Sequence, residues 1–191
     1  MIRIYSPVRA ERIIRRYDEW IRSVAARYDI PAAAIKAILF QEMTQIDLWD
    51  LAADAATYLG LFGRRDSSTG YAQIFGWVAV NAANFASDRG LTDYRSLGIN
   101  TDHRLDPENA ADVRMVWKRL HGSRKANMEF AALNLLCAAQ EMTGRIDFAS
   151  YSKDEMKLIL TRYNANVTYI TPYGEAAYRN YLRYAGSESE C

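Results

Sequence analysis

One helical segment constrains the fold more than any other part of the sequence. Residues 31–44 read PAAAIKAILFQEMT, in which a proline precedes residues that are apolar around most of a helical circumference. A helix without a broad polar face must be covered by protein on most of its sides. The rest of the chain is therefore expected to pack around this segment as a central, buried helix.

The other periodic segments also favour helices. In residues 7–30 apolar side chains recur at spacings of three and four, and Ser6 before Pro7 is typical of a helix start. Comparable patterns predict further helices over residues 48–58, 70–86, 107–120, 127–143, 152–164 and 172–185. Alternating β-branched runs are few, so the expected fold class is all-α, with at most a small hairpin in the loops. No linker divides the chain, and residues 1–191 are predicted to form a single domain.

Composition narrows the class of partner and cofactor. A net charge of +1 gives no electrostatic reason to expect nucleic acid. Cys137, Cys191, His103 and His121 do not form a zinc motif, and we predict no metal or other cofactor. No stretch is long and apolar enough to cross a bilayer, and no signal peptide is readable at the N-terminus. We expect a monomer.

The tetrapeptide QEMT occurs twice, and each copy ends an apolar, helix-like run with a glutamate, Glu42 and Glu141. A carboxyl group can act as an acid at neutral pH only if its surroundings raise its pKa, and the end of a buried helix facing a cleft does so. Glu42 follows the most apolar helix and precedes a polar, glycine-containing loop. We therefore assign chemistry to Glu42 and interpret Glu141 as structural or exposed.

The loop RRDSSTGYAQIF carries groups that suit a sugar substrate. Asp66 is a second carboxylate, Gly70 allows a ligand to approach the backbone, and Gln73 offers an acceptor and two donors. A glutamate acid and an aspartate together are the equipment of many glycosidases. The plain alternative for Asp66 is an Asx turn within its own loop.

Four stretches, in order, resemble motifs of the lytic transglycosylases and goose-type lysozymes. AIKAILFQEMT resembles their helix ending in the catalytic glutamate, and STGYAQI their Gly-Leu-Met-Gln motif. NMEFAALNLL is similar to their Asn-Ile-x-x-Gly-x-x-Tyr-Leu helix, and RYNANVTYITPYGEAAYRNYLRY to their Tyr-Asn-Ala-Gly segment with the tyrosine-bearing helix after it. The resemblance spans residues 17–184. The chain departs from the family pattern at Met43, where the family has serine, at Tyr71-Ala72, and at Asn166, where the family has glycine.

This resemblance implies a lysozyme-like helical domain whose cleft binds peptidoglycan glycan strands. Glu42 would protonate the β-1,4 bond between N-acetylmuramic acid (MurNAc) and N-acetylglucosamine (GlcNAc). Two routes can follow. The 6-hydroxyl of MurNAc closes a 1,6-anhydro ring, or Asp66 positions a water for hydrolysis. Of the two, the sequence slightly favours hydrolysis. The implied substrate-binding residues are Ser68, Tyr71, Gln73, Tyr163 and Asn164. Tyr163 is expected to stack on a sugar and to hydrogen-bond Glu42.

The implied substrate also bears on location. Peptidoglycan lies outside the cytoplasmic membrane, so a protein without a readable signal would reach it by phage-mediated release, by signal-less export, or as part of a longer secreted protein. Two other classes stay open. One is a catalytically inactive glycan-binding protein on the same fold, which the residues after Glu42 favour. The other is a helical interaction protein that uses the seven arginines within residues 3–27.

Overall fold

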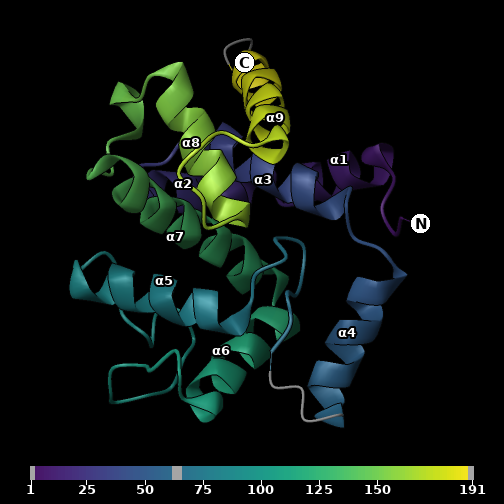
Figure 1. The fold of residues 1–191 in the computed structure, drawn as a ribbon, viewed down its shortest axis with the longest axis vertical. Coiled ribbons are helices and arrows are strands. Elements are labelled where there is room, and N and C mark those ends of the chain that lie inside the picture. The colour runs from purple at the N-terminus through teal and green to yellow at the C-terminus, as the bar shows by residue number, and fades with distance from the viewer. Residues whose placement is uncertain (1–2, 62–65, 189–191) are drawn as a thin grey trace.

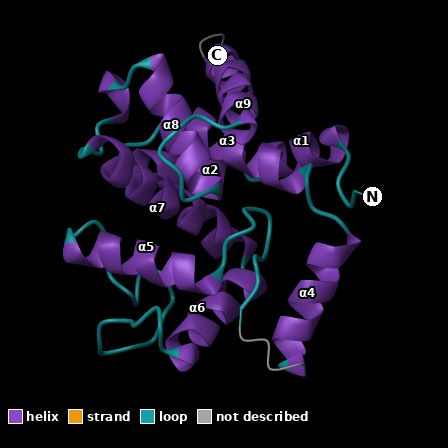
Figure 2. Ribbon diagram, viewed as in Figure 1, coloured by secondary structure: helices purple, strands orange, loops and turns teal. Residues whose placement is uncertain are grey.

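The computed structural model describes residues 3–61 and 66–188, with side chains as far as Gly186, so Cys191 lies outside it. Within these ranges the structure has nine α-helices. Figures 1 and 2 show that its regular elements are helical, with no strand. The all-α prediction is confirmed for this part of the chain. No helix in it is both long enough and apolar enough to span a membrane.

The helices follow one another with short connections, apart from the longer segments between α4 and α5 and between α5 and α6. In chain order they are α1 (Pro7–Arg16), α2 (Asp18–Tyr28), α3 (Ala32–Met43), α4 (Leu48–Leu59), α5 (Gly76–Asp88), α6 (Ala110–Gly122), α7 (Arg124–Thr143), α8 (Lys153–Asn164) and α9 (Pro172–Glu188). A short 3₁₀ turn, Phe148–Ser150, precedes α8.

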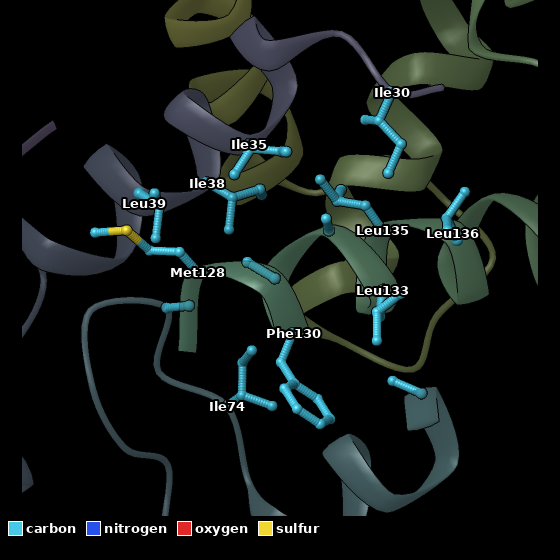
Figure 3. Packing of buried hydrophobic residues seen from close by; sticks show 14 of the residues in the cluster. Ile30, Ile35, Ile38, Leu39, Ile74, Met128, Phe130, Leu133, Leu135 and Leu136 are labelled. Carbon is cyan, nitrogen blue, oxygen red and sulfur yellow. The ribbon is translucent and has the colours of Figure 1, made fainter. Parts of the chain in front are cut away.

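The central helix is α3, as its apolar sequence predicts. It packs against α1, α2, α7 and α9, and its buried residues lie on all sides of the helix. Figure 3 shows Leu39 of α3 next to Met128 of α7 within the core. The buried Lys36 of α3 pairs with Asp18 of α2 at 2.7 Å between Nζ and Oδ1. Such pairing is what allows an ammonium group to lie inside a protein.

Local capping contacts begin two of the helices, and the helix start predicted at Ser6 is confirmed. The Ser6 hydroxyl accepts the Arg9 amide at the start of α1. At the start of α8, the Ser152 hydroxyl accepts the Glu155 amide, and the Glu155 carboxylate accepts the Ser152 amide at 2.8 Å. These reciprocal bonds satisfy amide groups that have no partner within the helix, and they depend on nearby residues alone.

Several predicted helix boundaries were wrong. The helix expected from residue 127 begins at Arg124, and the helix expected to end at residue 185 runs to Glu188. The helix expected over residues 7–30 is divided at Tyr17 into α1 and α2. The helix expected from Pro107 begins at Ala110, because Asn109 rather than Asp106 caps it; the Asn109 side chain accepts the Ala111 amide at 2.8 Å. A further error concerns the segment before α5 and bears on the site.

Residues 70–75 form a tight turn where a helix had been expected. Gly70 has a φ of 73° and Gln73 a φ of 47°, and an α-helix cannot include left-handed residues. The Thr69 and Ile74 amides each donate to the other residue's carbonyl, at 3.1 and 3.3 Å, so the small hairpin consists of a single bridge. α5 begins only at Gly76.

α4 differs from every other helix in the part of the chain described. It contributes no apolar residue to the buried core, and its buried residues, Asp54 and Thr57, are polar. Figure 1 shows it at the edge of the molecule. Asp54 accepts hydrogen bonds from the hydroxyls of Ser67 and Thr69, both at 2.8 Å. Hydrogen bonds to the loop before α5 therefore help to hold α4, which forms one wall of the site.

Candidate active site

Glu42 lies where α3 ends. The Thr44 hydroxyl donates to the carbonyl oxygens of Phe40 and Gln41, at 2.9 and 3.0 Å, and so satisfies acceptors that the last turn leaves open. The chain then turns sharply, buries Ile46, and starts α4 after Asp47. Glu42 is thereby held at the end of the most buried helix, facing the first turn of α4 across the turn.

Glu42 lines a cleft of about 490 Å³. This volume falls within the range of roughly 300–1,000 Å³ that is typical of ligand sites. The walls come from the ends of α3 and α8, the starts of α4 and α5, the loop before α5, and the middle of α7. The lining residues are Arg3, Glu42, Gln45, Ile46, Asp47, Asp50, Ser68, Gln73, Ile74, Phe75, Trp77, Val78, Asn134, Arg162, Tyr163, Asn164 and Asn166. Amides, carboxylates and aromatic rings thus meet at one end of the helical bundle.

Its surroundings raise the pKa of the Glu42 carboxyl group towards neutrality. Burial raises its pKa to about 7 by removing water from the charged form, and the negative charge of Asp50 adds to this effect. A hydrogen bond from Tyr173 opposes both, because it favours the ionised carboxylate. With a pKa near neutrality, about half of the molecules carry the proton at pH 7.

Tyr173, at the start of α9, donates its hydroxyl proton to Glu42 Oε1. Burial raises the pKa of Tyr173 well above its ordinary value, so its hydroxyl keeps the proton that it donates. From the sequence this contact is expected of Tyr163, but the Tyr163 hydroxyl donates instead to the Ala72 carbonyl at 2.9 Å. The available signal for Tyr173 was its place beside Pro172 at the start of a helix, within a stretch that resembles a family motif.

We expect Tyr173→Phe to shift the pH dependence of cleavage. Without the hydroxyl, the ionised form of Glu42 loses its hydrogen bond and the pKa of Glu42 rises, so activity should persist to higher pH. The expected displacement of the alkaline limb is up to about one pH unit. Rates across pH would be compared with those of Tyr169→Phe, which removes an exposed hydroxyl. A shift towards lower pH would contradict the role given to Tyr173.

The loop before α5 presents its side chains to the cleft in a fixed arrangement. The Ser68 hydroxyl donates to Gln73 Oε1 at 3.0 Å, and Gln73 Nε2 donates to the Gly70 carbonyl at 2.8 Å. Gln73 holds a left-handed backbone, a conformation that costs a non-glycine residue roughly 1 kcal/mol or more and is common at functional sites. The fully buried Asn127 secures the turn by bonding the Thr69 carbonyl and the Ala72 amide, at 2.9 and 2.8 Å.

The structure brings together five of the seven residues predicted from sequence. Those that line the cleft are Glu42, Ser68, Gln73, Tyr163 and Asn164, and those that do not are Asp66 and Tyr71. Tyr71 packs edge-on against Tyr5, with ring centres 5.9 Å apart, and lies under Arg124. It lines a neighbouring hollow of about 150 Å³ that shares Ile46, Asp50 and Gln73 with the cleft.

Asp66 serves as a cap for α5. Its carboxylate accepts the amides of Gly76 and Trp77, at 2.7 and 3.1 Å, and of its neighbour Ser67 at 2.9 Å. Burial raises the pKa of Asp66, although these three bonds favour its ionised form. The contacts correspond to a turn-and-cap role for Asp66, and they leave the water-positioning role without support from the cleft.

Asp66→Ala is expected to destabilise the protein by about 1–2 kcal/mol, the usual cost of losing a helix cap. The buried Gly76 amide would lose its partner at the start of α5. Urea unfolding would measure the change, and Asp66→Asn, which keeps an oxygen acceptor, should lose less. Unchanged stability in Asp66→Ala would contradict the capping role. If Asp66→Asn lost far more cleavage activity than folded protein, Asp66 would regain a role in the reaction.

Several cleft residues were not anticipated from sequence. Asp47 and Asp50 form the reciprocal cap of α4: Asp47 Oδ1 accepts the Asp50 amide, and Asp50 Oδ2 accepts the Asp47 amide at 2.9 Å. Their D-x-x-D spacing is visible in the sequence, but it does not reveal that they face Glu42. Trp77 and Asn134 lie on helices whose periodicity predicts burial rather than an open wall.

Among the side chains that the structure describes, no three His, Cys, Asp or Glu residues are placed together to hold a metal ion. No family model, curated protein or solved structure matches the chain. The cleft itself is therefore the basis for inferring function.

Proposed function

We propose that this protein cleaves the β-1,4 bond between MurNAc and GlcNAc in peptidoglycan glycan strands, with Glu42 as the general acid. The observation that carries this proposal is a carboxyl group with a pKa of about 7 in a cleft lined by amides, hydroxyls and aromatic rings. The resemblance of four sequence motifs to the lytic transglycosylases supports the choice of substrate. Such a substrate places the protein's action outside the cytoplasmic membrane.

Glu42 has the contacts that a general acid needs. Since Tyr173 holds Oε1, Oε2 is the oxygen left to carry the proton towards the substrate. Transfer of this proton to the glycosidic oxygen releases GlcNAc as the bond to MurNAc C1 breaks and positive charge develops on the MurNAc ring. The resulting carboxylate keeps the Tyr173 bond, which favours the ionised form at the moment it appears.

The second half of the reaction needs a nucleophile. Because Asp66 is engaged by α5, we propose that the nucleophile is the 6-hydroxyl of MurNAc itself, which attacks C1 and closes a 1,6-anhydro ring. The Glu42 carboxylate accepts the proton of that hydroxyl and is restored to its starting form, so no second carboxylate is required. The alternative is hydrolysis, with Asp50 positioning the water, since Asp50 lines the same cleft.

The cleft walls suit a chain of amino sugars. Phe75 and Trp77 expose 43% and 49% of their surface at the start of α5, where their rings can cover the apolar faces of sugar rings. Asn134, Asn164 and Gln73 add amide groups that can both donate to and accept from acetamido and hydroxyl groups.

Product analysis tests the proposal directly. Purified peptidoglycan would be incubated with the protein, and the released fragments read by mass spectrometry. Fragments ending in 1,6-anhydroMurNAc, lighter by one water than reducing ends, would support the proposed route. Reducing ends would show hydrolysis and make Asp50→Asn the next variant. No release of fragments from several peptidoglycan types across a range of pH would overturn the enzymatic function.

A further inference from the structure

The cleft that contains Glu42 continues into a second hollow. This hollow has a volume of about 380 Å³ and shares four lining residues with the first, namely Trp77, Val78, Asn134 and Arg162. Its remaining walls come from α5 and α7, with Asn81, Phe85, Cys137 and Glu141 among them. A ligand bound beside Glu42 can therefore extend past Arg162, as an elongated polymer would.

Arg162 stands at the junction of the two hollows. It belongs to α8, and its Nε lies 2.6 Å from Oε2 of Glu141, near the end of α7. Only 25% of the Arg162 side chain is exposed, against 49% for Glu141. Glu141, in the second QEMT, thus holds Arg162 at the wall of the cleft. Glu42, in the first QEMT, is the proposed acid.

The Arg162 guanidinium keeps N–H donors that a ligand could bind. The closest contact with Glu141 is made by Nε, and among the described residues no hydrogen bond engages the terminal amino groups Nη1 and Nη2. Arg162 and Glu141 are the only charged residues on the part of the second hollow that the structure describes. The carboxylates of the first hollow, Glu42, Asp47 and Asp50, come from α3, α4 and the turn between them. A planar carboxylate is the group that a guanidinium fork binds best, through parallel hydrogen bonds.

We propose that Arg162 recognises a carboxylate carried by the glycan substrate, while Glu141 holds the guanidinium from its other side. This inference rests on the proposed function and adds the substrate group that selects between glycans. In peptidoglycan a carboxylate has two sources: the lactyl group of MurNAc where the peptide is absent, and the stem peptide where it is present. Neutral polymers of GlcNAc have neither.

Binding would be measured in a Glu42→Gln background, which prevents cleavage during the experiment. The probes are chitohexaose, peptide-free glycan strands and peptide-bearing glycan strands, each titrated by calorimetry. Arg162→Gln should weaken binding of at least one carboxylate-bearing strand about tenfold and leave chitohexaose unaffected. An effect on peptide-free strands identifies the lactyl group as the source, and an effect confined to peptide-bearing strands identifies the stem peptide.

Glu141→Gln is the matched control, because it breaks the same ion pair while keeping both the arginine and an oxygen acceptor for Nε. It should retain the preference for carboxylate-bearing strands. Provided that chitohexaose still binds, three results would overturn the role of Arg162. Glu141→Gln could weaken binding as much as Arg162→Gln does, Arg162→Gln could weaken chitohexaose binding equally, or Arg162→Gln could leave the binding of every strand unchanged. If none of these glycans bound even with Arg162 in place, the proposed function would fail, and this inference with it.

Discussion

Replacing Glu42 with glutamine is expected to lower the turnover number on peptidoglycan by about 10²- to 10⁴-fold, the usual contribution of a general acid. Glutamine has nearly the same shape and can still accept the Tyr173 hydrogen bond, but its amide has no proton to give near pH 7. The rate of release of soluble fragments at saturating substrate would measure the loss. Glu19→Gln, which changes an exposed glutamate of α2, serves as the control.

The same variant can be checked without substrate, through stability. The folded protein raises the pKa of Glu42 from 4.5 to about 7, so the folded state binds the proton more tightly than the unfolded chain does. Wild-type stability is therefore lost as pH rises from about 4.5 to 7, and Glu42→Gln should avoid that loss. Urea unfolding should find the variant more stable than wild type at pH 8 by on the order of 3 kcal/mol, with no such gain at pH 4. If Glu42→Gln and wild type were equally stable at both pH 4 and pH 8, the raised pKa of Glu42 would be contradicted. If Glu42→Gln turned over peptidoglycan at the wild-type rate, Glu42 would be excluded as the acid.

Gly174→Ala is expected to destabilise the protein by about 3 kcal/mol or more. A Cβ at this position would lie 1.9 Å from the Thr161 hydroxyl oxygen and 2.7 Å from the carbonyl oxygen of Lys157. The hydroxyl can rotate away, but the carbonyl belongs to the backbone of α8, so α8 and α9 would have to move apart. Because Tyr173 precedes Gly174, the same movement would weaken its bond to Glu42.

Gly186 provides a matched comparison for this variant. It lies on the same helix, and a Cβ added there would meet no atom within 4 Å. Gly186→Ala should leave stability unchanged or raise it slightly, since alanine favours helix more than glycine does by about 1 kcal/mol. Thermal unfolding followed by circular dichroism would compare the two variants with wild type. If Gly174→Ala unfolded at the wild-type temperature, α8 and α9 would not pack as closely as described.

Local sequence patterns predicted most of the helices and some of their caps because these features depend on residues close together in the chain. The apolar circumference of α3 required a covered, central helix, and the structure buries it between α1, α2, α7 and α9. The capping pair Ser152 and Glu155 was visible for the same reason. The end of α3 is also where a glutamate would be both held firmly and deprived of water, which is how Glu42 could be selected.

Contacts across helices could not be read in this way. Tyr173 lies 131 residues from Glu42 and reaches it only because α9 packs against α3. From the sequence, Asp66 was equally suited to positioning a water and to stabilising a turn. Because Gln73 has a left-handed backbone, α5 begins only at Gly76, and Asp66 caps it there. Likewise, Glu141 meets Arg162 only where α7 and α8 pack together. The sequence alone thus determined which helices form and which glutamate ends the buried one. The packing of those helices determined which side chains face it, since burial and distance between remote residues arise only when the chain is folded.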